Sequence, residues 1–60
     1  MEYEIIAKFK NGKVITLVYV DDYEEAICMA DDVFDYAPLI METEVYNIKE
    51  NRSEKFFSRD

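Results

Sequence analysis

Apolar and polar residues alternate through residues 2–20, and this two-residue period is typical of β-strands. β-branched and aromatic side chains fill the region on both sides of Asn11-Gly12, a dipeptide that favours a tight hairpin turn. We therefore predict a β-hairpin in which Asn11 and Gly12 form a two-residue loop. Such a loop places Lys10 opposite Lys13 and sets the register of the whole hairpin.

This register assigns the side chains of the predicted hairpin to two faces. The face expected to form the core comprises Tyr3, Ile5, Ala7, Phe9, Val14, Thr16, Val18 and Val20. The opposite face comprises Glu4, Ile6, Lys8, Lys10, Lys13, Ile15, Leu17 and Tyr19. Its apolar residues, Ile6, Ile15, Leu17 and Tyr19, would form an exposed patch of a kind that monomers seldom carry. We expect the C-terminal segment, a second copy of the chain or another protein to cover this patch.

Residues 22–37 show the three- and four-residue spacing of an amphipathic helix. Its apolar face is expected to hold Tyr23, Ala26, Ile27, Ala30, Val33, Phe34 and Ala37. Asp22 is a suitable N-cap because Glu25 follows three residues later, as in a capping box. Pro38 is expected to end the helix, since it disfavours helical geometry in the residue before it.

Residues 39–50 are predicted to form a third strand, and residues 51–60 a polar C-terminal tail. The order strand, strand, helix, strand indicates an α+β fold, a two-layer ββαβ sandwich. A right-handed crossover from the second strand places the third beside the first, which gives a three-stranded antiparallel sheet of order 2-1-3. Residues 1–50 would then form a single domain, with Ile27 and Phe34 of the helix buried against the sheet.

The composition excludes most catalytic chemistry. A chain of 60 residues has room for one domain, and half of its residues are hydrophobic. It contains no histidine, one cysteine and one glycine, so histidine-activated nucleophiles, structural zinc sites and phosphate-binding glycine loops are excluded. We therefore expect a binding protein and not an enzyme, without a metal or cofactor.

Three features of the sequence indicate a compartment. The one cysteine, Cys28, cannot form an internal disulfide bond. The acidic start, residues 1–4, is unlike a signal peptide, and no apolar run approaches the ~20 residues of a membrane span. The expected location is the cytoplasm, which for a phage-encoded protein means the cytoplasm of the host cell.

The net charge of −7 is concentrated in the middle of the chain. Residues 21–50 contain ten acidic residues and one lysine, whereas residues 1–20 and 51–60 each carry a net charge of +1. Direct binding of nucleic acid requires a basic face, so this distribution argues against it. A protein whose own basic surface normally binds nucleic acid would be attracted to the acidic middle segment.

The acidic residues of the predicted helix fall on the side opposite its apolar face. They are Glu24, Glu25, Asp31, Asp32 and Asp35. Two interpretations remain open: a solvated face that confers solubility, or a surface that imitates nucleic-acid phosphates and binds a basic groove. The second is supported by the lack of basic residues within helical reach, and by Asp35, whose charge opposes the helix dipole.

Short stretches of the chain resemble small acidic phage proteins that inhibit a host enzyme. The stretch 15–45, in which residues 22–26 (Asp-Tyr-Glu-Glu-Ala) open the predicted helix and residues 36–38 (Tyr-Ala-Pro) close it, is similar to the T-odd phage inhibitor of host RNA polymerase. Residues 9–11 (Phe-Lys-Asn) and 21–22 (Asp-Asp) are similar to the T-even phage antitoxin (Dmd), which neutralises host endoribonuclease toxins. That antitoxin family carries a functional aromatic residue where this chain has Glu25, so this role is not transferred.

These observations predict a small acidic inhibitor or antitoxin that binds a host nucleic-acid enzyme through the acidic helix face. The resemblance implies an endoribonuclease toxin or RNA polymerase as the target. The alternative is a structural or assembly module that self-associates through the apolar patch of Ile6, Ile15, Leu17 and Tyr19. Neither function requires direct contact with nucleic acid or with a membrane.

Overall fold

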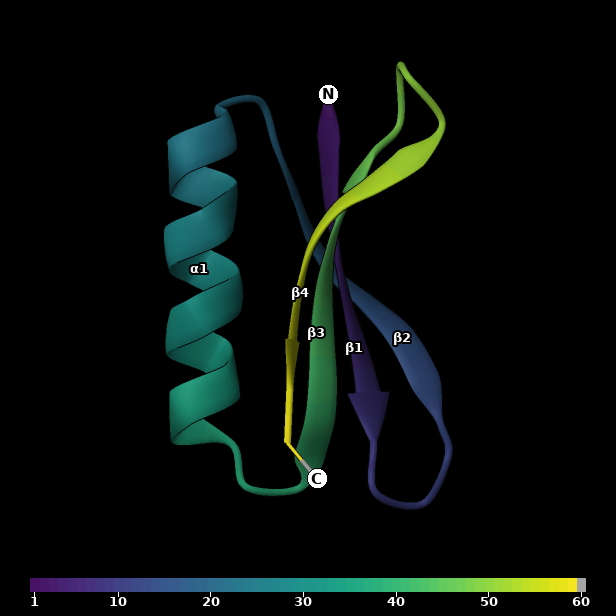
Figure 1. The fold of residues 1–60 in the computed structure, drawn as a ribbon, viewed down its shortest axis with the longest axis vertical. Helices are drawn as coiled ribbons and strands as arrows, with labels where there is room; N and C mark the ends of the chain where they lie inside the picture. The colour runs from purple at the N-terminus through teal and green to yellow at the C-terminus, as the bar shows by residue number, and fades with distance from the viewer. Residues whose placement is uncertain (60) are drawn as a thin grey trace.

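The computed structural model describes residues 1–59, which form a two-layer α+β structure (Figure 1). The elements are β1 (Tyr3–Phe9), β2 (Val14–Val20), α1 (Tyr23–Tyr36), β3 (Ile40–Asn47) and β4 (Arg52–Ser58). The strands form a four-stranded antiparallel sheet of order β2-β1-β3-β4, and α1 covers one of its faces. The face against α1 is termed the helix side, and the other is termed the outer face. In the described residues, no helix is long and apolar enough to cross a membrane.

The α+β class and the relative order of the first three strands agree with the prediction. The predicted number of strands is wrong, because residues 51–60, expected to be a tail, contain β4, which pairs with β3. The sequence of β4, Arg-Ser-Glu-Lys-Phe-Phe-Ser, does not predict a strand, because it is mostly polar and its apolar and polar residues do not alternate. Pairing with β3 therefore determines this strand more than its own pattern does.

The turn between β1 and β2 has three residues instead of two. The Phe9 amide donates to the Lys13 carbonyl at 2.7 Å, and the Gly12 amide donates to the Phe9 carbonyl at 2.9 Å. Gly12 has a φ of 90°, whereas Asn11 lacks the positive φ that the predicted turn type requires. The Asn11 side chain instead accepts a hydrogen bond from the Lys13 amide at 2.9 Å. The register next to the turn is therefore shifted by one residue from the predicted one.

A β-bulge at Leu17 reverses this shift further along β2. Ile6 pairs with Thr16 and Ile5 pairs with Val18, which leaves Leu17 without a partner on β1. Beyond the bulge, the predicted pairing of Ile5 with Val18 is confirmed. Between the turn and the bulge, the side chains of β2 lie on the faces opposite to those predicted, because a shift of one residue exchanges the faces of a strand.

The shifted register removes two residues from the predicted apolar patch. Leu17 packs against the core on the helix side, and Ile15 pairs with the fully buried Ala7, which places it on the same side. Thr16 moves to the outer face, where its hydroxyl donates to Glu4. The assignment of Ile15 and Leu17 to the outer face is thus wrong. The cause is the pair of irregularities at the turn and at the bulge.

α1 begins and ends within one residue of the predicted limits. The Asp22 side chain accepts a hydrogen bond from the Glu25 amide at 2.9 Å, which satisfies one of the free N–H groups of the first turn. At the other end, the Ala37 amide donates to the Val33 carbonyl at 3.0 Å, and Pro38 follows. Local signals at both ends are therefore sufficient to define the helix.

The core lies between α1 and the sheet. Its buried apolar residues are Ile5, Ala7, Val20, Ala26, Ala30, Ile40 and Val45. The small side chains of Ala26 and Ala30 face the sheet, and the hydroxyl of the fully buried Thr43 donates to the Ala30 carbonyl at 3.1 Å. This hydrogen bond links the helix to the sheet and satisfies a polar group that burial would otherwise destabilise.

The two larger helix residues predicted to be buried lie at the rim of the core. Ile27 is half-buried against the central cluster. Phe34 is also half-buried, and it packs against Phe57 of β4 with 6.4 Å between the ring centres. The prediction that Ile27 and Phe34 fill the core is therefore wrong in detail, since Ala26 and Ala30 occupy its centre.

Candidate partner-binding surfaces

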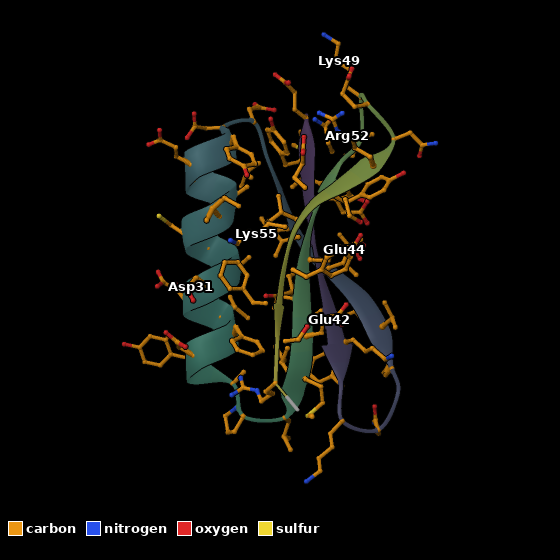
Figure 2. All side chains as sticks on the ribbon, in the orientation of Figure 1. Asp31, Glu42, Glu44, Lys49, Arg52 and Lys55 are labelled. Atoms are coloured by element: carbon orange, nitrogen blue, oxygen red, sulfur yellow. The ribbon has the colours of Figure 1, made fainter. Side chains whose placement is uncertain are left out.

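The acidic residues predicted on α1 all lie along its solvent side, in two groups separated by the exposed Cys28. Glu24, Glu25, Asp31, Asp32 and Asp35, all exposed, are termed the acidic stripe. With about 3.6 residues per turn, these side chains project away from the buried side of α1, which Ala26 and Ala30 mark. Figure 2 labels Asp31 partway along the helix. The helix therefore holds its carboxylates in a row along one rigid axis.

No carboxylate of the acidic stripe takes part in an ion pair within residues 1–59. The ion pairs in this range join the Met1 amino group to Asp21 at 3.7 Å, and Arg52 to Glu54 at 3.5 Å. Neither pair involves α1 itself. The carboxylates of the stripe are thus without a contact ion pair in this part of the chain.

Most basic side chains lie at the two ends of the sheet. Lys10 and Lys13 belong to the turn between β1 and β2, and Lys49 and Arg52 lie at the connection between β3 and β4 (Figure 2). Lys8 lies within β1 opposite Glu42, and Lys55 lies between α1 and the sheet. This distribution leaves the length of α1 acidic and concentrates the positive charge at the ends of the molecule.

Lys55 lines a groove between α1 and β4. The groove has a volume of about 320 Å³, and its lining residues are Tyr23, Glu24, Ile27, Cys28 and Lys55. The Lys55 ammonium lies 5.6 Å from the centre of the Phe57 ring, within the range of a cation–π interaction. The groove therefore forms one border of the acidic stripe and combines apolar, acidic and basic groups.

Arg59 supplies the positive charge that the last turn of α1 lacks. That turn contains no basic residue. The Arg59 guanidinium donates to the Phe34 carbonyl and, at 2.9 Å, to the Ile40 carbonyl. Because this charge lies at the negative end of the helix dipole, it offsets the unfavourable position of Asp35. Asp35 is therefore weaker support for a binding role than the sequence suggested.

The outer face of the sheet is more polar than the predicted apolar patch. Ile6 and Tyr19 remain on this face, where their neighbours on paired strands include Glu4 and Glu44. Figure 2 shows Glu42 and Glu44 on the side of the sheet away from α1. The apolar surface is thus broken into separate pieces by carboxylates.

Hydroxyl groups on neighbouring strands bind each of these outer-face glutamates. Thr16 donates to Glu4, Ser53 donates to Glu44, and Ser58 donates to Glu42 at 3.5 Å. Glu42 and Glu44 were not among the predicted site residues, although the alternation in residues 41–45 (Met-Glu-Thr-Glu-Val) does place both on one face of the strand. The molecule consequently carries acidic groups on both of its broad surfaces.

The chemistry of the ionisable side chains depends on how they cluster and on their pKa values. No group of three or more histidine, cysteine, aspartate or glutamate side chains there could hold a metal ion. Burial raises the pKa of the Tyr3 hydroxyl above its usual value of 10, and nearby carboxylates, including Glu2 and Glu54, raise it further. A hydroxyl held protonated in this way is not activated as a base or a nucleophile.

No protein-family model, curated protein or solved structure shows significant similarity to this chain. The surfaces of the chain itself are therefore the main basis for a proposal about its function.

Proposed function

We propose that the chain is a small inhibitor that binds the basic, nucleic-acid-binding surface of a host enzyme through the acidic stripe. The observation that carries this proposal is a row of exposed carboxylates on one rigid helix, without ion pairs in residues 1–59. A basic groove that binds the phosphates of a nucleic-acid strand also attracts a row of carboxylates, because both carry negative charge. A bound stripe occupies the surface that the enzyme needs for its nucleic-acid substrate, and inhibition follows.

The separation of charges supports a binding role over a purely solubilising one. Surfaces that serve solubility alone usually mix positive and negative side chains. Here Lys10, Lys13, Lys49 and Arg52 lie at the ends of the sheet, although bases placed on α1 would stabilise the helix through i,i+4 pairs. Such a separation gives the stripe a directional field that steers a basic partner towards it.

The resemblance to phage proteins supplies two classes of target. Residues 22–26 and 36–38, which resemble the inhibitor of host RNA polymerase, lie at the start and at the end of α1. Residues 9–11 and 21–22, which resemble the antitoxin, lie at the β1–β2 turn and directly before α1. We therefore propose an endoribonuclease toxin or RNA polymerase as the bound enzyme.

The alternative, a module that self-associates through the outer face, is less well supported. Ile15 and Leu17 lie on the helix side, so half of the predicted patch is missing from that face. Two outer faces packed together would also bring the carboxylates of Glu4, Glu42 and Glu44 against their counterparts. Like charges placed directly opposite one another destabilise such contacts.

A charge reversal on the stripe tests the proposal. We would immobilise the parent chain and the D31K/D35K variant, expose both to a bacterial lysate, and identify the retained proteins by mass spectrometry. The control variant is E42K/E44K, which makes the same change in net charge on the outer face. We expect the parent and the control, but not D31K/D35K, to retain an enzyme of nucleic-acid metabolism, and added duplex DNA or structured RNA to release it.

The association rate with the retained enzyme gives the quantitative test. Electrostatic steering weakens as the Debye length falls from ~10 Å at 0.1 M salt to ~3 Å at 1 M. The D31K/D35K variant should therefore associate more slowly at low salt and depend less on salt than the control. Equal association rates for the two variants would show that the stripe serves only solubility. Full activity of the enzyme when it is saturated with the chain would exclude inhibition.

A further inference from the structure

The two edges of the sheet differ in their protection against pairing with another strand. β4 carries Arg52, Glu54 and Lys55, and charged side chains on an edge strand discourage further pairing. β2, the other edge, has the sequence Val-Ile-Thr-Leu-Val-Tyr-Val and contains no charged residue over its 7 positions. β2 is the terminal strand of the sheet and pairs only with β1, and the amides and carbonyls of residues 14–20 make no backbone hydrogen bond to any other segment within residues 1–59. The backbone groups of β2 that point away from β1 are therefore available.

We propose that β2 pairs with β2 of a second copy of the chain, in an antiparallel arrangement that joins the two sheets into one. An antiparallel pair of identical strands has a two-fold axis, so each copy contributes the same surface and the assembly is closed. Such a dimer uses the edge of the sheet and leaves the outer face exposed. It is independent of the enzyme that the acidic stripe binds.

The bulge at Leu17 selects the register of this pairing. Opposite residues of paired strands must lie on the same face of the sheet. Because the bulge adds one residue, Ile15 and Val20 both lie on the helix side, and Thr16 and Tyr19 both lie on the outer face. A two-fold axis between Leu17 and Val18 therefore pairs Ile15 with Val20 and Thr16 with Tyr19 of the second copy, with every face matched.

The charges beside β2 are complementary in the same register. The residues directly outside the matched strands are Lys13 at one end and Asp21 and Asp22 at the other. The two-fold axis brings the Lys13 end of each β2 to the end of the other β2, where Asp21 and Asp22 begin the connection to α1. Opposite charges therefore lie near one another at both ends of the contact, which favours this register.

The arrangement also keeps the acidic stripes away from the contact. The two-fold axis runs perpendicular to the joined sheet, so both helices lie on the same side of it. α1 packs mainly on β3 and least on β2, which leaves the two helices well separated at the seam. The dimer thus presents two acidic stripes in one direction, and a partner with an extended basic surface could engage both with a gain in avidity.

Sedimentation equilibrium of the purified chain tests the dimer. A contact between single strands is small, so we expect reversible dimers at concentrations of about 0.1 mM and above. K13E should raise the dissociation constant by at least about tenfold, because two symmetry-related attractions become repulsions. The control is K10E, which changes the net charge equally but lies on the β1 side of the turn, and we expect it to stay within about threefold of the parent.

Hydrogen exchange locates the contact. On passing from dilute to concentrated solution, the outward-facing amides of β2 should exchange more slowly, while those at the edge of β4 should not change. The proposal is overturned if the chain is still monomeric at about 1 mM. It is also overturned if K13E and K10E weaken the dimer equally, or if the slower hydrogen exchange appears on β4 or on the outer face instead.

Discussion

β2 and β4 are the two edge strands of one sheet, and each has 7 residues, yet they are held by different means. β2 is rich in β-branched residues and is joined to β1 by a tight turn. β4 is mostly polar, and its attachment depends on Phe57, Lys55 and the neighbouring Arg59, which reach the groove or the end of α1. One edge is therefore stabilised mainly by its own sequence, and the other by contacts with the helix.

The contrast has a consequence for binding. The charges of β4 protect its edge, and its contacts with α1 make it part of the fold. β2 keeps an uncharged edge that is available for pairing, with only the bulge at Leu17 to interrupt it. One edge of this sheet is thus protected against pairing with another strand, and the other is not. The substitutions below compare the stability of the two edges.

The largest effect is expected from a matched pair of substitutions on β4. Phe57 packs on Phe34 at the helix side, whereas Phe56 is 51% exposed. F57A should lower the free energy of unfolding by about 2–4 kcal/mol, because it removes a half-buried aromatic side chain and leaves a cavity. F56A should change it by less than about 1 kcal/mol. Urea denaturation followed by circular dichroism measures both, and equal effects would show that β4 does not hold the helix.

The next effect concerns the link between Arg59 and α1. R59M should lower the free energy of unfolding by about 1–2 kcal/mol, since it removes charge-assisted hydrogen bonds to the carbonyls of Phe34 and Ile40. R52M, at the other end of β4, loses only a partly exposed ion pair with Glu54 and should change it by less than about 0.5 kcal/mol. Thermal melts of the two variants decide whether the helix end depends on β4.

A substitution in the turn before β2 tests the edge of the sheet that depends on local sequence. G12V should lower the free energy of unfolding by about 1–2 kcal/mol, because a β-branched residue is strained at the φ of 90° found here. A Cβ atom at this position meets no atom within 4 Å, so the effect comes from the backbone and not from a clash. G12N is the control, since asparagine tolerates this region better. Equal melting temperatures for G12V and the parent would exclude the three-residue turn.

The smallest effect is a change of stability at alkaline pH. Tyr3, which pairs with Val20 of β2, has a raised pKa because burial and neighbouring carboxylates disfavour its charged form. The folded state therefore holds the Tyr3 proton more tightly than the unfolded state does. Stability should be unaffected below the ordinary tyrosine pKa of about 10 and should fall as the pH rises through it. Y3F should show a smaller fall in melting temperature between pH 9 and 11, and an identical fall would exclude Tyr3 as the cause.

The candidate site was predictable only in part. The acidic stripe follows from helical periodicity, so Glu24, Glu25, Asp31, Asp32 and Asp35 could be grouped from the sequence alone. The outer face could not be derived in the same way, because the assignment of Ile15 and Leu17 depended on an assumed turn of two residues. One extra residue in the turn and a second at the bulge were enough to exchange the faces of half a strand.

The sequence by itself determined the hairpin, α1 with its Asp22 cap, and the separation of acidic and apolar sides along the helix. These features depend on residues close together in the chain, so propensity, spacing and capping are sufficient to define them. Only the tertiary structure decided that a polar segment becomes β4, that Leu17 bulges towards the core, and that Arg59 binds the end of α1. Each of these depends on contacts between segments distant in sequence, where pairing and burial outweigh local preference.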